Sequence, residues 1–267
     1  MDLFALPPVA AVLGGAYHAL MGLSHLLEPA LGGGAAAAAV VAVTLAVRAA
    51  LIPVGVSQAR AERTRVRLAP RIAELQRRHR KDPEALQRAT MRLYADEGTT
   101  PLAGCLPMLL QAPVVGVIYA VFVHAEVAGQ ANALLGHTLF GVPLGTSLVG
   151  TLSAGVPAVA TVAVLGALVL AVALVGELTR RAALPGGRLA VPSATAVTAV
   201  TAGPSGAAGM QRVLGALQFV TAVVACFVPL AAGLYLLVTV AWTLVQRIVL
   251  RRRFPLDPEG GVRPAIP

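Results

Sequence analysis

Arg48 is the residue of this sequence best suited to binding chemistry, because it carries a permanent positive charge inside an apolar stretch. If the helix that contains it leaves the membrane near Ser57, Arg48 lies nine residues inside that end, or about 13 Å at ~1.5 Å per residue. A charge at that depth costs roughly a few kcal/mol or more unless it faces protein or water. We therefore expect Arg48 to attract acidic groups into a water-accessible cavity.

Three further polar side chains fall in apolar stretches and extend this site. Thr44 precedes Arg48 by one helical turn and shares its face. Gln111 falls in the middle of another apolar stretch, and Tyr235 brings a hydroxyl to a third. Together the four residues predict a polar groove that opens towards the cytoplasm. The alternative is that Arg48 and Gln111 bond to backbone carbonyls and hold helices together.

Composition indicates that the bilayer is the solvent of most of the chain. The sequence is 57% hydrophobic and 12% charged, whereas about a quarter of a soluble domain is charged. Residues 127–176 and 213–246 contain no Asp, Glu, Lys or Arg, and each run exceeds the ~20 residues that cross a membrane. A net charge of +9 with 4% aromatic residues fits membrane topology better than nucleic-acid binding. We expect no nucleic-acid partner.

The order of the apolar stretches predicts an all-α integral membrane protein with five transmembrane helices. The second uncharged run is too long for one span, and Pro229 and Gly233 near its middle favour a tight turn. The expected spans cover residues 35–57, 99–125, 156–179, 211–228 and 234–251, with the turn at 229–233.

The basic residues predict the orientation of these spans, because cytoplasmic loops collect Lys and Arg. With the N-terminus outside and the C-terminus inside, 20 of the 21 basic residues lie in cytoplasmic segments or near the cytoplasmic ends of spans, and the remaining one is Arg48. The expected outer segments are 1–34, with an interfacial helix or, as the alternative, a sixth span, and the loop 126–155. The expected cytoplasmic segments are 58–98, a linker at 180–210 and a tail at 252–267.

The segment 58–98 predicts a helical hairpin between spans one and two. Leu68, Ile72 and Leu75 recur at helical spacing. Asp82 can cap a second helix that has Pro83 at its first position. The candidate functional residues of this hairpin are Arg71, Glu74, Arg77, Asp82, Pro83 and Tyr94. The alternative is a solvated basic linker that only enforces topology.

Several stretches of the chain resemble the YidC/Oxa-type membrane protein insertase family. In the expected hairpin they are RLAPRIAELQ (67–76), KDPEALQ (81–87) and MRLY (91–94), and the start of the next span reads PLAGCLPMLLQAP (101–113). Further matches are Arg48 with Pro53 and Gln58, Phe140-Gly141, Leu144-Gly145, and Pro229 through Tyr235 and Trp242 to Gln246. The resemblance covers roughly residues 41–253. Leu236 departs from it, because many members have a second aromatic residue there.

The resemblance implies an insertase of the bacterial plasma membrane, whose helices enclose a hydrophilic groove open to cytoplasm and lipid. Nascent membrane proteins and lipids are then its partners, and the Sec translocon and the ribosome are candidate further ones. The sequence contains no nucleotide-binding motif, nucleophile elbow or metal-ligand cluster, so we expect no enzyme activity, cofactor or metal. The alternatives are a small-solute transporter, a polytopic membrane enzyme or a non-catalytic assembly factor.

Overall fold

The computed structural model describes residues 7–98, 116, 120–123, 126–127, 130–155, 158–183 and 219–253. The chain divides into two compact units. The first unit comprises Met1–Leu51, Gln111–Leu178 and Leu217–Leu244. The second comprises Ile52–Leu110, Thr179–Ala216 and Val245–Pro267.

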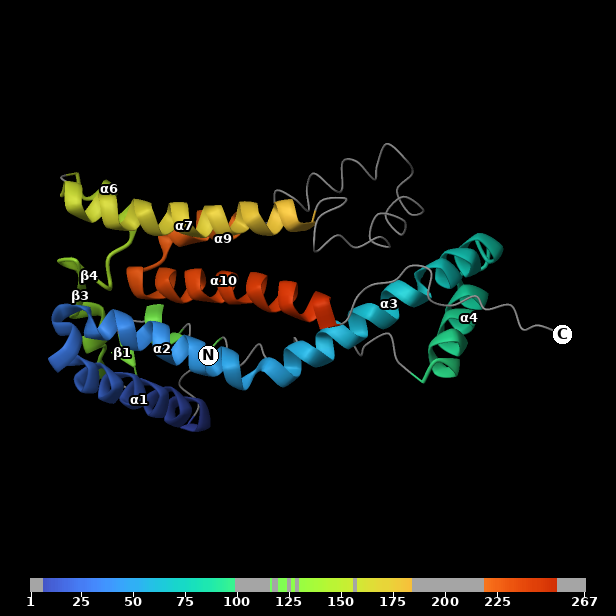
Figure 1. Ribbon diagram of the computed structural model, residues 1–267, viewed down its shortest axis with the longest axis horizontal. Coiled ribbons are helices and arrows are strands. Elements are labelled where there is room, and N and C mark those ends of the chain that lie inside the picture. The colour runs from blue at the N-terminus through green and yellow to red at the C-terminus, as the bar shows by residue number, and fades with distance from the viewer. Residues whose placement is uncertain are drawn as a thin grey trace. The chain divides into compact units, whose positions relative to one another are not determined.

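The first unit begins with two apolar helices that fold back on each other. Helix α1 (Pro7–Leu31) and helix α2 (Ala35–Ala50) are joined by a single 3-10 turn, η2 (Gly32–Gly34), and pack against each other (Figure 1). Gly32 adopts a φ of 51°, a left-handed conformation that glycine tolerates without a steric penalty. Most of the buried residues of α2 are alanines, and small residues let two helix backbones approach closely.

Three segments among the described residues are long and apolar enough to cross a membrane: Ala10–Ala50, Val159–Ala182 and Leu230–Arg253. The protein is therefore a mostly helical membrane protein. The second and third segments correspond to helices α7 (Val159–Ala183) and α10 (Leu230–Arg253). Most of the expected span 99–125 and the first part of 211–228 lie outside the described residues, and helix α9 (Val220–Phe227) represents the rest of the latter.

The break between α9 and α10 is shorter than the turn expected at 229–233. Val228 is extended, with a ψ of 155°, and α10 starts at Leu230. Pro229 can precede a helix directly because its ring fixes φ near the helical value. The amides of Leu230 and Ala231 donate to the carbonyls of Thr146 and Leu144, each at 2.9 Å. These bonds satisfy the free amides of the first turn, so the helix begins earlier than the sequence suggested.

The expected outer loop between residues 126 and 155 contains short regular elements that were not predicted from the sequence. It contains two short antiparallel hairpins, β1 (Glu126–Val127) with β2 (Gln130–Ala131) and β3 (Thr138–Leu139) with β4 (Val142–Pro143). A 3-10 turn, η4 (Ala133–Gly136), and a short helix, α6 (Leu148–Ser153), complete it. Asn132 is 7% exposed and donates from its side chain to the carbonyl of Val121 at 2.8 Å, which fastens the loop to the helical part of the unit.

The second unit contains helix α3 (Ile52–Arg78) and helix α4 (Pro83–Asp96). Helix α2 ends at Ala50 and a turn at Leu51 separates it from α3, whereas the sequence suggested one helix through residue 57. At its start α3 meets the end of α10 closely, because a Cβ atom on Gly55 would overlap the side-chain amide of Gln246. Glycine at position 55 therefore permits this contact.

Candidate functional site

Arg48 lies in the last turn of α2 and is half-buried. Since α2 ends at Ala50, Arg48 is close to a helix C-terminus rather than nine residues inside a helix that continues to residue 57. The negative end of the helix dipole favours a cation there. No carboxylate in the described part of the chain pairs with its guanidinium. Arg48 therefore has charge available for an acidic group that the described residues do not supply.

Thr44 is 1% exposed and bonds within its own helix. Its hydroxyl donates to the carbonyl of Val40 at 2.6 Å, the back-bonding common for threonine in helices. Val40 belongs to the same buried apolar cluster as Tyr235. This hydrogen bond satisfies the hydroxyl hydrogen of Thr44 beside the apolar core. Only the lone pairs of the Thr44 oxygen are left to accept further hydrogen bonds.

Tyr235 is 3% exposed, and its ring lies 5.8 Å from that of Phe122. It is the first member of a polar row along α10, because Thr239 and Thr243 follow at intervals of four residues and so share its face. The hydroxyl of Thr243 donates to the carbonyl of Thr239 at 2.8 Å. The hydroxyl of Thr239 is buried and has no partner among the described residues.

Thr239 and Thr243 were missed by the reasoning from sequence, although their spacing from Tyr235 was a visible signal. A buried hydroxyl without a partner costs about 1–3 kcal/mol, unless water or a ligand reaches it. The row therefore gives α10 a polar face within an otherwise apolar span. Gln111, the fourth predicted groove residue, lies outside the described residues.

The carboxylate of Glu97 joins α3 to the end of α4. One oxygen accepts from Arg67 at 2.5 Å and the other from Arg71 at 2.9 Å. Arg71 was a predicted site residue, whereas Arg67 and Glu97 were not singled out. Glu97 is 22% exposed on its side chain, so the two ion pairs are partly shielded from water. Together they close the α3–α4 pair at the end opposite its turn.

The other predicted residues of this pair have separate roles. Glu74 pairs with Arg78 one turn further along α3, at 2.6 Å. Asp82 caps α4 by accepting from the amide of Ala85 at 2.9 Å, and Pro83 is the first residue of that helix. Arg77 is exposed and Tyr94 is half-buried. Glu74, Asp82 and Pro83 thus shape the pair of helices, and the exposed Arg77 remains available to bind another molecule.

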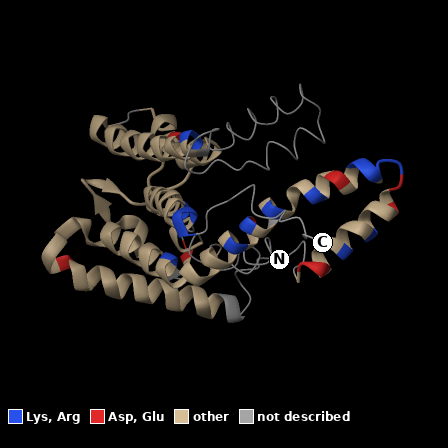
Figure 2. Ribbon diagram, turned by 45° about the vertical axis from the view of Figure 1, so that its right-hand side comes forward, with Lys and Arg blue, Asp and Glu red and all other residues tan. Residues whose placement is uncertain are grey.

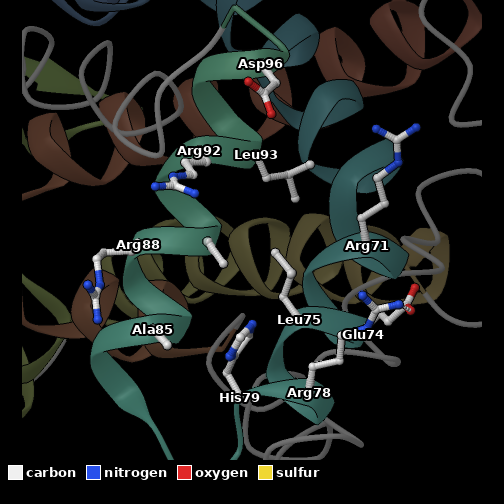
Figure 3. A pocket seen from close by; sticks show the side chains of 11 residues that line it. Arg71, Glu74, Leu75, Arg78, His79, Ala85, Arg88, Arg92, Leu93 and Asp96 are labelled. Carbon is white, nitrogen blue, oxygen red and sulfur yellow. Dashed lines mark hydrogen bonds and ion pairs between the residues drawn. The ribbon is translucent and has the colours of Figure 1, made fainter.

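A cavity of about 580 Å³ lies between α3 and α4 (Figure 3). Leu75 and Leu93 point into it from the two helices, and His79 lies at its turn-side end. No residue of α4 is buried, so the apolar faces of the two helices do not cover each other. The border of the cavity is mostly basic and is formed by Arg71, Arg78, Arg88 and Arg92 with Glu74 and Asp96. This arrangement suits an apolar segment that carries acidic groups.

Basic residues lie along α3 and α4 and in the last turns of α7 and α10 (Figure 2). In α7 they are Arg180 and Arg181, and in α10 they are Arg251, Arg252 and Arg253. Within the described residues no group of His, Cys, Asp and Glu is arranged to hold a metal ion.

Comparison with known proteins identifies the family. The profile of the family described as "60Kd inner membrane protein" matches residues 27–257. The chain is 36% identical over 95 residues to the membrane protein insertase YidC of Clostridium perfringens, covering 35% of this chain and 40% of the relative. It is 32% identical over 115 residues to the membrane protein insertase YidC of Alkalihalophilus pseudofirmus, covering 40% and 44%.

A third relative is the membrane protein insertase YidC 1 of Listeria monocytogenes, 36% identical over 102 residues, which cover 36% of each chain. The matched segments thus span less than half the length of these relatives. The profile match, in contrast, covers most of the present chain. On that ground the chain belongs to the 60Kd inner membrane protein family, which is the YidC/Oxa1 family.

Proposed function

We propose that this protein is a membrane protein insertase, which moves nascent membrane proteins from the cytoplasm into the bilayer. The observation that carries the proposal is Arg48, a half-buried guanidinium in an apolar helix for which the described residues provide no carboxylate. The insertase names of the relatives support the same activity. In this scheme the chain acts as a chaperone: it guides the nascent protein into the bilayer and makes or breaks no covalent bond.

The proposed topology has five spans, an outer N-terminus and a cytoplasmic C-terminus. Basic last turns on both α7 and α10 support it, because arginines at the ends of spans favour the cytoplasmic side. The α3–α4 pair is then a cytoplasmic hairpin between the first two spans. Its basic-rimmed cavity receives the incoming chain before that chain reaches the membrane.

The proposed groove is lined by Arg48, Thr44, Gln111 and Tyr235, and we add Thr239. Arg48 attracts acidic residues in the part of the substrate that must cross the membrane, since Coulomb attraction is much stronger at low effective dielectric than in water. The unpartnered hydroxyl of Thr239 supports a wet face on α10. The apolar helix of the substrate then leaves sideways into lipid, driven by burial of its apolar surface.

Reconstitution tests the proposal. Liposomes that contain only this protein receive a single-span substrate with an acidic extracellular tail, and inserted tails are counted by their protection from external protease. We expect wild type to insert it, Arg48→Lys to retain part of the activity and Arg48→Ala to lose most of it. Arg252→Ala removes an exposed arginine from the end of α10 and is the matched control.

Two outcomes would count against the proposal. If wild type inserts no more than empty liposomes, autonomous insertion is wrong, and assays with added Sec translocon or ribosomes then test an accessory role. If Arg48→Ala is as active as Arg252→Ala, the groove does not work through Arg48.

A further inference from the structure

We propose that Phe140 and the crevice beside it form a lipid-binding site, in which the phenyl ring lies in the membrane interface and the crevice holds a phospholipid acyl chain. In the topology under Proposed function, this is the outer leaflet. The site does not depend on insertase activity, so the two proposals can fail separately.

Phe140 has an unusual backbone and an unusual exposure. It is the only described residue other than glycine with a positive φ, 52°, and the next residue, Gly141, has a φ of 79°. The two form the turn between β3 and β4, and positive φ at both central residues is typical of such two-residue turns, where asparagine and glycine are preferred. A bulky side chain is disfavoured there. Phe140 nevertheless leaves 83% of its surface exposed, so the fold gains little from having it.

The turn is held rigidly beside α2 and α10, which belong to membrane-length segments. Strand β3 contacts η2 and α2, and the amide of Leu144 donates to the carbonyl of His137 at 2.8 Å. The carbonyl of Leu144 in turn accepts from Ala231 at the start of α10. Phe140 is therefore fixed at the level where α2 and α10 begin, and aromatic residues are enriched at that level of membrane proteins.

A crevice of about 460 Å³ continues from Phe140 along α2, within the range of ~300–1,000 Å³ that small ligands occupy. Its lining contains only apolar residues and one glycine: Leu31, Gly34, Ala37, Ala38, Val41, Leu139, Phe140 and Leu234. Leu31 and Phe140 are both exposed, and Leu45, one turn beyond Val41, is 41% exposed. The crevice is thus continuous with an exposed apolar face of α2. Because α2 and α10 belong to membrane-length segments, lipid is the solvent at this face, and an acyl chain is the occupant that matches its lining.

Fluorescence quenching tests the site. The chain has one tryptophan, so Trp242→Phe gives a silent background into which Phe140→Trp or Val41→Trp is introduced. Proteoliposomes are made with phospholipids brominated near either the headgroup or the chain end. We expect the shallow bromines to quench position 140 more strongly and the deep bromines to quench position 41 more strongly. Ala131→Trp, at an exposed position of β2, is the control that aqueous iodide should quench.

Two results would overturn the proposal. Quenching of position 140 by iodide and not by brominated lipid would place the ring in water. Quenching by neither would mean that protein, and not lipid, covers it. The insertion assay on the same proteoliposomes reports separately on the proposed function.

A second variant covers the case in which tryptophan disturbs the turn. Phe140→Asn replaces the ring with a residue that positive φ favours, so it should fold at least as well as wild type. In detergent, added phospholipid should raise the melting temperature of wild type more than that of Phe140→Asn. Equal shifts would argue against a lipid contact at this residue.

Discussion

The guanidinium of Arg251, in the last turn of α10, donates to the carboxylate of Glu62 in α3 at 2.8 Å. The two residues are 189 positions apart in the sequence. The side chain of Arg251 is only 15% exposed, so the ion pair is partly shielded from water. This ion pair fastens the first half of α3 to the end of α10. It lies near the contact of Gly55 with Gln246, so two separate contacts hold the same pair of helices.

Removal of this ion pair should loosen α3 from α10. Partly exposed pairs contribute about 0.2–1 kcal/mol, and we expect Glu62→Gln or Arg251→Gln to lower the melting temperature in detergent by up to roughly 4 °C. The exchanged pair, Glu62→Arg with Arg251→Glu, should recover part of the loss. Glu74→Gln breaks a more exposed pair with Arg78 and should change the melting temperature less. A larger effect of Glu74→Gln would contradict the role of the Glu62–Arg251 ion pair in holding α3 to α10.

Gly233→Ala should destabilise the packing of α10 on α7. A Cβ atom at this position would overlap a methyl group of Leu168, which is 7% exposed and has little room to move. Alanine normally stabilises a helix by ~1 kcal/mol relative to glycine, but overpacking costs about 1–3 kcal/mol. We expect a lower melting temperature, recovered by Leu168→Val. Gly166→Ala should raise stability and is the matched control, because its Cβ atom would meet nothing within 4 Å in the part of the chain that the structure describes.

Glu97→Gln should separate the end of α4 from α3, because a neutral amide cannot hold both Arg67 and Arg71 by charge. Spin labels at the exposed positions Arg77 and Gln87 measure the distance between the helices in a background without cysteine. The distribution should broaden in Glu97→Gln and stay narrow in Glu74→Gln. An unchanged distribution would show that apolar contacts alone hold α4 in place.

Thr239→Val separates stability from function. Replacement of an unpartnered buried hydroxyl by a methyl group of similar shape should leave stability unchanged or raise it by up to ~1 kcal/mol. If that hydroxyl serves the groove, insertion of the acidic-tailed substrate should fall several-fold. Thr243→Val is the control, since its hydroxyl is already bonded within the helix. A loss of stability in Thr239→Val that parallels the loss of insertion would indicate a structural role instead.

The sequence could predict the long helices because their signals are local. Apolar length places α7 and α10, and the Asp82-Pro83 pair marks the start of α4 as the structure has it. The orientation, the five spans and the groove residues remain predictions. The family assignment followed from the motifs at residues 67–94 and 101–113 and agrees with the profile match over 27–257.

Features that depend on tertiary contacts could not be read in this way. The early start of α10 needs carbonyls from Leu144 and Thr146, which are distant in sequence. The break at Leu51 is different, because Pro53 in the first turn of α3 has no N–H to bond to the carbonyl of Ala49 and is a local signal for it. The double ion pair of Glu97 joins residues 26 and 30 positions apart, and short strands of two residues carry no periodic signal.

The hydrogen bonds from the amides of Leu230 and Ala231 to the preceding loop also determine how deeply the last helix inserts into the membrane. In the proposed topology, that loop is synthesised and exported before α10 leaves the ribosome. Helix α10 then docks on the carbonyls of Thr146 and Leu144, which the folded loop already holds in place. Its outer end is set by the loop, and any extra apolar residues added to α10 would push the arginines at its other end further into the cytoplasm.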